Sequence, residues 1–203
     1  MTSLPTPGAV LDYWIGPATH DHLAANRLNK RWFIKSAETD AFIKSRFSGL
    51  LEALGEGLAD AWFAAGTRQT LAAVIVLDQF SRNIYRGTPK AFAFDGLALK
   101  LSKAALERGD ASKLTEVEHA FLLMPLEHSE ALSDQQACVT AFEALEAASR
   151  PSFRPLISNS LDYAHQHHKV IEQFGRFPHR NVILGRENTE AEADYLKRPG
   201  SGF

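Results

Sequence analysis

The sequence predicts an all-α protein, and three kinds of observation support that prediction. Apolar side chains recur along most of the chain at the spacing of one helix face. No window shows the alternation of apolar and polar residues that is typical of a half-buried strand. Caps, prolines and glycines divide the chain into segments of helix length. We expect a single domain over residues 1–203, with about eight or nine helices packed as antiparallel hairpins.

The first helix is expected to begin at the Thr-Pro pair of residues 6–7. Threonine accepts a hydrogen bond from a free backbone amide, and proline suits the first helical position. The Gly-Pro pair at residues 16–17 ends this helix. Residues 18–31 show no clear division, and Trp32 and Phe33 after them are expected to pack on the core.

The next helices are also bounded by caps and glycines. Residues 39–40 are expected to cap a helix whose apolar stripe covers 42–54, and a short helix over 58–65 ends at Gly66. Thr67 is expected to cap the helix that follows.

The central helix, residues 71–86, differs from the others in its pattern. Its first half, Leu71 to Leu77, is apolar on every side, which indicates a helix surrounded by neighbours. Its second half carries a polar arc when successive residues are placed about 100° apart. The residues of this arc are Asp78, Gln79, Arg82, Asn83 and Arg86.

The second half of the chain repeats these signals. Residues 88–89 begin a helix that Gly109 ends, and residues 115–118 form a capping box. We expect Pro125 to kink the helix after that box and Asp134 to open the next one. A long helix then spans 152–174 and ends at Gly175, and a second capping box, 189–192, begins a short terminal helix.

Composition narrows the class of protein. The net charge of −2 provides no positive surface for nucleic acid or an anionic membrane, so we expect neither partner. The longest apolar run, 71–77, is far shorter than the ~20 residues that cross a bilayer. The N-terminus lacks a signal-peptide pattern, and a single cysteine, Cys138, excludes an internal disulfide. We therefore expect a cytoplasmic protein in which Cys138 packs between helices.

The candidate catalytic residues are Asp78, Glu127, His128 and His167. His128 continues the apolar face of its helix and His167 lies on the apolar arc of the long helix, so both imidazoles are expected to point inward. Histidine titrates near neutral pH, and a neighbouring carboxylate shifts its pKa, which suits general acid–base catalysis. Inward histidines are also typical of hydrogen-bonded core residues, so both interpretations stand.

The candidate ligand-binding residues come from the polar arc and from the loop at 174–187. Loops on a rigid scaffold are where binding residues tend to lie. The planar guanidinium of arginine donates two parallel hydrogen bonds, which suits a carboxylate or a phosphate. The candidates are Gln79, Arg82, Asn83, Arg86, Arg176, His179, Arg180 and Asn181.

Known motifs for other sites are absent from the sequence. It contains no GxxxxGK[ST], GxGxxG, HExxH or GxSxG pattern. The side chains of Asp78, Glu127, His128 and His167 could bind a metal, but their spacing follows no metal-site pattern. We therefore predict no metal and no cofactor.

Three ordered segments resemble a known bacterial family, the uncharacterised domain of unknown function 924. They are LDQFSRNIYRGTPKAFAFD (77–95), FLLMPLEHSEALSDQ (121–135) and HHKVIEQFGRFPHRNVILGRENTEAE (167–192). Residues 11–16 and 32–47 are similar to the N-terminal pattern of the family. The resemblance covers nearly the whole chain and implies a single all-helical domain, similar in packing to tetratricopeptide-like helical hairpins, with no established activity.

The motif positions of this family coincide with the candidate residues above. They fall on Asp78, Gln79, Arg82, Asn83, Arg86, Glu127, His128, His167, Gly175, Arg176, His179, Arg180 and Asn181. The chain departs from the family pattern at Ser81, at His168-Lys169 and at Gln173. The lysine at 169 stands where an aspartate is common, which weakens the case for a carboxylate beside His167.

Three interpretations of these residues remain open. The first is a pocket for a small anionic ligand, with or without catalysis by a histidine general acid–base, in which Asp78, Arg82, His128 and Arg180 meet around one hollow. The second is a tetratricopeptide-like scaffold for a peptide or protein partner, whose buried polar network is structural. In the third, the network only locks helices together. The sequence does not determine the oligomeric state.

Overall fold

The computed structural model describes residues 3–202, and the regular elements within that range are all helical. The α-helices are α1 (Pro7–Trp14), α2 (His22–Phe33), α3 (Ala37–Ala53), α4 (Ala59–Ala65), α5 (Thr67–Ile75), α6 (Ser81–Ile84), α7 (Asp95–Glu107), α8 (Glu116–Glu127), α9 (Leu132–Ala148), α10 (Arg154–Phe174), α11 (Asn181–Leu184) and α12 (Glu190–Leu196). Two π-helical turns, η2 (Leu54–Leu58) and η3 (Val76–Phe80), join α3 to α4 and α5 to α6. The 3-10 turns are η1 (Gly16–Thr19), η4 (Pro89–Phe92), η5 (Asp110–Lys113) and η6 (Pro178–Arg180).

The predicted all-α class is confirmed, and the helices of the described residues exceed the predicted eight or nine. Counting α5 to α6 as one continuous helix and leaving aside the single turn of α11 gives about ten helices. The difference arises because residues 18–31, which the sequence did not divide, contain most of α2.

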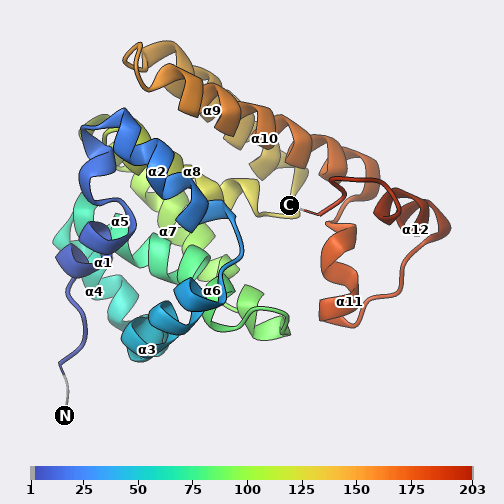
Figure 1. Cartoon of the computed structure of the whole chain (residues 1–203), viewed down its shortest axis with the longest axis horizontal. Coiled ribbons are helices and arrows are strands. Elements are labelled where there is room, and N and C mark those ends of the chain that lie inside the picture. Colours follow the sequence, from blue (N-terminus) through green and yellow to red (C-terminus); the bar gives the residue numbers. More distant parts are fainter. Residues whose placement is uncertain (1–2, 203) are drawn as a thin grey trace.

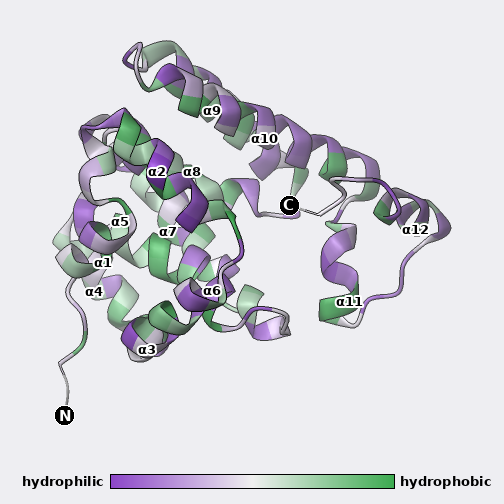
Figure 2. Ribbon diagram, in the orientation of Figure 1, coloured by the Kyte–Doolittle hydropathy of each residue, from purple (hydrophilic) through white to green (hydrophobic). Residues whose placement is uncertain are grey.

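Helices α1 to α8 form a body around α5, and the later helices lie along one side of it (Figure 1). Helix α5 packs against α1, α4, α7 and α8. Helices α9 and α10 form a long antiparallel hairpin, and the chain after α10 turns back through α11 and α12 (Figure 1). Hydrophilic residues dominate the outer side of α10 (Figure 2). Among residues 3–202, no helix combines the length and apolarity needed to cross a membrane.

The central helix is buried as the sequence predicts. Leu71 to Leu77 and Phe80 have no exposed surface. The helix passes through the π turn η3 before continuing as α6, so one turn is wider than the rest of the helix. Asp78 and Gln79 lie in that wide turn and are buried with it. Thr67 does not cap the helix: Gly66 takes that position, and the Thr67 hydroxyl donates to Asp110.

Three other local predictions are corrected. Helix α3 begins at Ala37 because the Ser36 hydroxyl, three residues before the expected start of the cap at 39–40, accepts from the Thr39 amide. Phe33 is 54% exposed, whereas Trp32 packs edge-on against Phe121 as expected. Phe42 lies outside the buried stripe of α3 and stacks on Tyr13.

The second half of the chain follows most of its start and stop signals, with one correction: residues 88–89 begin only the 3-10 turn η4, and α7 starts at Asp95. Both capping boxes form, at the start of α8 and of α12. Helix α8 continues through Pro125 to Glu127, which places Glu127 and His128 at its buried end. Helix α9 begins at Leu132, two residues before the predicted Asp134. Gly175 ends α10 in the left-handed conformation, with a φ of 67°.

Gly175 offers a test of how the long helix ends. Gly175→Ala should lower the free energy of unfolding by about 1 kcal/mol, because a Cβ disfavours the left-handed conformation. The control is Gly49→Ala on the exposed side of α3, where a Cβ meets only Leu4 at 3.6 Å. Gly49→Ala should raise stability by up to about 1 kcal/mol through helix propensity. Urea denaturation measures both changes, and equal effects of the same sign would contradict the assignment.

Candidate functional site

A buried carboxylate lies at the centre of the candidate site. Asp78 is 1% exposed. Its Oδ1 lies 2.8 Å from Nδ1 of His128 and 3.3 Å from Nη1 of Arg82. The Gln79 amide donates to its Oδ2 at 2.5 Å. Burial raises the pKa of Asp78, but the charge of Arg82 and the hydrogen bonds from His128 and Gln79 outweigh burial and hold the pKa well below its usual range.

His128 follows the last residue of α8 and is largely buried against Asp78. Burial lowers the pKa of His128 below its ordinary value, and the opposing charge of Asp78 offsets only part of that effect. The imidazole is therefore neutral near pH 7. Because ionised Asp78 can only accept, Nδ1 of His128 carries the proton and donates to it. The lone pair of the ring is then on Nε2.

Arg82 is held by a second carboxylate from a different helix. Its two terminal nitrogens donate to the two oxygens of Asp95, at the start of α7, at 3.0 Å each. Its guanidinium also donates to the backbone carbonyl of Asp78. Burial raises the pKa of Asp95, and Arg82 lowers it in part. Arg82 therefore joins the central helix to α7 as a bidentate ion pair.

Arg180, the last residue of η6, also lies beside His128 and Asp95. Its side chain is 8% exposed, and its guanidinium carbon lies 4.9 Å from the ring centroid of Phe92 and 4.4 Å from that of Phe177. Nη1 donates to the backbone carbonyl of His128 at 3.1 Å and lies 3.7 Å from Asp95. The buried Nε has no hydrogen-bond partner. Burial, and then the charge of Arg82, lower the pKa of Arg180 to about 10.

A second carboxyl–imidazole contact lies beside the first. Nδ1 of His167, on α10, lies 3.2 Å from Glu127 and donates to the Tyr163 carbonyl at 2.8 Å. The rings of His128 and His167 are 6.3 Å apart. Burial lowers the pKa of His167 to about 3. Burial, with the charge of Asp78, raises the pKa of Glu127 to about 8, so both groups are neutral near pH 7.

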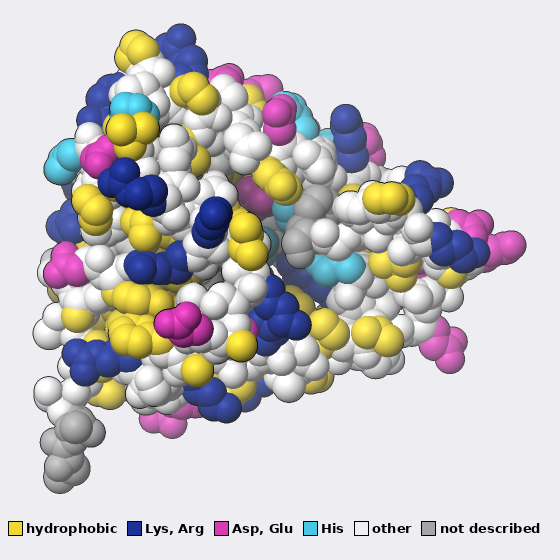
Figure 3. Space-filling model, in the orientation of Figure 1, with side chains coloured by type: hydrophobic (Ala, Val, Ile, Leu, Met, Phe, Trp, Pro, Cys, Tyr) yellow, Lys and Arg dark blue, Asp and Glu magenta, His cyan; other side chains and the backbone are white. Residues whose placement is uncertain are grey.

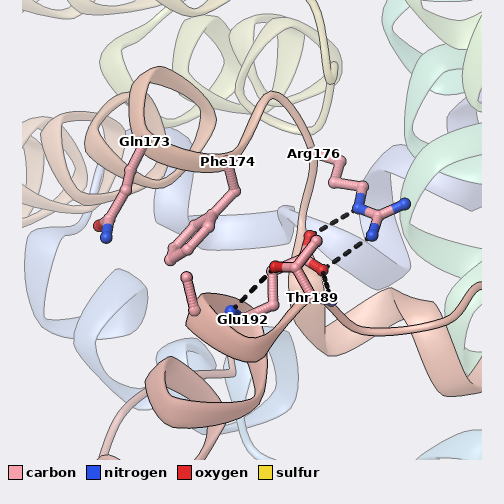
Figure 4. Close-up of a pocket in the computed structure, with 6 residues that line it drawn as sticks. Gln173, Phe174, Arg176, Thr189 and Glu192 are labelled. Carbon is pink, nitrogen blue, oxygen red and sulfur yellow. Dashed lines mark hydrogen bonds and ion pairs between the residues drawn. The ribbon is translucent and has the colours of Figure 1, made fainter.

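Three other candidate residues form ion pairs or hydrogen bonds that do not involve Asp78. Asn83 and Arg86 both donate to Asp40 of α3, at 2.6 to 2.8 Å. Arg176 forms a bidentate pair with Glu192 of α12, at 2.6 and 2.7 Å (Figure 4). These contacts tie neighbouring segments together away from Asp78.

The remaining two candidates come from the same loop as Arg180. The Asn181 amide donates to Asn188 at 2.7 Å, and its carbonyl accepts from Arg186. His179 is buried, which lowers its pKa to about 4, and its Cβ lies beside Gly202. The structure therefore brings together seven of the twelve predicted residues in one cluster, which we call the Asp78 cluster. Its members are Asp78, Gln79, Arg82, Glu127, His128, His167 and Arg180.

The molecular surface is hollowed between the body and the chain that follows α10, and Lys or Arg and His side chains lie in that hollow (Figure 3). Two cavities lie elsewhere. One of about 590 Å³ is lined by Gln173, Phe174, Arg176, Thr189, Ala191 and Glu192 (Figure 4). The other, of about 460 Å³, lies where α8 begins and is lined in part by Glu116, His119 and Arg150. Within residues 3–202, no group of three or more His, Cys, Asp or Glu side chains could hold a metal ion.

Sequence reasoning missed three residues around the cluster. Asp95, Phe92 and Glu130 hold Arg82, Arg180 and Arg186, respectively. Asp95 lies within the 77–95 segment that resembles the family, so its place in that motif could have marked it as a candidate site residue. Its partner is 13 residues away along the chain, and helical spacing cannot connect them across the η4 turn.

Residues 10–200 match a family described as "Bacterial protein of unknown function (DUF924)". The chain belongs to this family. A solved structure, entitled "Structure of Protein of Unknown Function ATU0120 from Agrobacterium tumefaciens", is 32% identical, with a TM-score of 0.74 over 90% of this chain and 98% of the other. No curated protein matches the chain. The family resemblance seen in the sequence is thus confirmed.

The raised pKa of Glu127 predicts how the stability of this DUF924 protein depends on pH. Folded Glu127 binds a proton up to about pH 8, whereas the unfolded carboxyl loses it near its ordinary value. Stability from this group is therefore lost as pH rises toward 8, by about 1 to 2 kcal/mol between pH 6.5 and 8. The lowered pKa values of His167 and His179 act below this window.

Glu127→Gln should remove that loss, because the amide stays neutral at every pH. Urea denaturation at pH 6.5, 7.2 and 8 measures the slope, with Glu143→Gln on the exposed side of α9 as the matched control. The control should keep the wild-type slope. The same slope in Glu127→Gln as in wild type would show that Glu127 ionises normally.

Proposed function

We propose that the Asp78 cluster binds a small molecule through an anionic group and that His128 acts there as a general acid–base. The observation that carries the proposal is the buried Asp78–His128 pair, 2.8 Å between Oδ1 and Nδ1, beside an arginine whose Nε is unpaired. Polar side chains are buried at a cost unless they are satisfied. Arg180 is therefore a group for which a ligand would supply a missing hydrogen bond.

Asp78 would determine which ring nitrogen of His128 is available for proton transfer. By accepting the Nδ1 proton, it holds the ring with the Nε2 lone pair away from itself. Nε2 can then take a proton from a substrate, and ionised Asp78 stabilises the imidazolium that forms. Arg82 and Gln79 keep Asp78 ionised and oriented, so they position the pair without touching the substrate.

Arg180 would hold the anionic group. The rings of Phe92 and Phe177 both lie against its guanidinium, and its Nε has no hydrogen-bond partner, so a ligand that reaches the fork gains a hydrogen bond there. An edge-on fork is the geometry in which arginine binds carboxylates. The neutral Glu127 and His167 lie behind His128 and add no charge that would repel an anion.

A specific observation also favours the alternative, a tetratricopeptide-like scaffold for a peptide or protein partner with a structural network. Asn83, Arg86 and Arg176 are fully engaged with Asp40 and Glu192, as a network that locks helices requires. The unpaired Nε of Arg180 favours the binding site over this alternative. For either function we expect the protein to act in the cytoplasm.

A thermal-shift screen of small carboxylates, phosphate and sulfate tests the proposal, because a ligand of the folded state raises its apparent stability. At least one anion should raise the Tm of wild type, and Arg180→Gln should remove that shift. Arg46→Gln, an exposed arginine on α3, is the matched control and should keep it. Arg180→Lys, which retains the charge and loses the fork, should reduce the shift.

Circular dichroism shows whether each variant is folded. If Arg180→Gln unfolds, the test passes to His128→Asn, which should weaken the shift from the same anion. Unchanged shifts in folded variants, or no shift from any anion in wild type, would contradict the proposal.

A further inference from the structure

The charges of the Asp78 cluster and of Asp95 beside it cancel one another. Asp78 and Asp95 are carboxylates, and Arg82 and Arg180 are cations that lie beside them. The remaining titratable members are neutral at pH 7. These are Glu127, which keeps its proton below about pH 8, and His128 and His167, whose pKa values burial lowers. The free site therefore carries no net charge.

An anion that enters such a site adds charge where little water can screen it. One negative charge beside His128 and Arg180 favours the charged form of the imidazole, because an opposite charge raises a histidine pKa. Other groups face His128 from each neighbouring element. They are Asp78 of η3, Arg82 of α6, Asp95 of α7, Glu127 of α8, His167 of α10, and Arg180 with His179 of η6.

Of these groups, His128 is the one placed to respond. The two arginines already carry their charge, and Glu127 already carries its proton below about pH 8. His167 donates through Nδ1 to a backbone carbonyl and is more deeply buried than His128. His128 alone combines a neutral ring with a contact to an ionised carboxylate at 2.8 Å.

We infer that the ligand of this site is a small monocarboxylate with an apolar body and that its binding takes up one proton on His128. This inference rests on the proposed function and names its ligand class. One proton on His128 restores neutrality for a monoanion, whereas a phosphate dianion leaves one charge uncompensated. The half-buried ring of Phe92, whose centroid lies 4.9 Å from the guanidinium carbon of Arg180, supplies apolar surface for the body of the ligand. The protonated His128 then faces the bound ligand as an acid.

Calorimetry with benzoate as the probe tests this inference. At pH 7, titrations in buffers of different ionisation enthalpy give the number of protons taken up per ligand. Wild type should take up close to one proton per benzoate, and its affinity should fall as pH rises from 6 to 8. Inorganic phosphate should bind at least about tenfold more weakly, a difference of about 1.4 kcal/mol.

For Asp78→Asn we expect the opposite result to wild type. A merely structural role of Asp78 would not produce that result. Removing this carboxylate leaves the free site with one positive charge, so benzoate itself restores neutrality. The folded variant should bind benzoate without proton uptake and without the pH dependence seen in wild type. His128→Asn should also abolish proton uptake. Arg46→Gln should keep the wild-type uptake.

The outcomes separate this inference from the proposed function. Phosphate binding tighter than benzoate, or benzoate binding to wild type without proton uptake, overturns the ligand class while the anion site stands. Proton uptake that persists in folded Asp78→Asn and His128→Asn places the proton elsewhere and also overturns the inference. If neither benzoate, other carboxylates nor phosphate binds, the proposed function fails together with it.

Discussion

The burial of the Asp78 carboxylate is the constraint on which the arrangement of the site depends. A charge removed from water is costly unless ion pairs and hydrogen bonds replace its hydration. The turn of η3 supplies only the Gln79 amide, because its other residues are apolar. The other partners come from the following turn, through Arg82, and from the end of α8, through His128. Satisfying one buried group thus draws separate segments to the same point.

The same requirement extends outward to the C-terminal segments. Arg82 needs Asp95, which anchors the start of α7. The carbonyl of His128 and the carboxylate of Asp95 in turn receive Arg180 from η6. The hairpin of α9 and α10 brings its own imidazole, His167, to the acid at the end of α8. The loop after α10 therefore reaches the body through polar contacts, whereas the α9–α10 hairpin also packs on α8 through apolar side chains.

Predictions from the sequence were correct where the interacting groups lie close together in the chain and incomplete where they lie far apart. Thr6, the box at 115–118 and Gly175 were read correctly because a cap or stop lies within a few residues of the group that it satisfies. The predicted start of α3 was wrong because Ser36, and not Thr39, caps the helix. Helical spacing correctly turned His167 inward but could not show that its partner is Glu127. The Asp78–Arg82 contact expected from spacing forms, at 3.3 Å, yet Asp95 is the closer partner.

The sequence alone determined the helical class, most helix ends, the burial of the central helix and the family, because these depend on periodicity, local caps and ordered motifs. Only the tertiary structure decided which polar residues meet. It joined Asp78 to His128 across 50 residues and Arg180 to His128 across 52, and it sent Arg86 to Asp40 instead. Ion pairing and desolvation depend on distance in space. Side chains of the same type and helix face therefore differ in role once the helices pack.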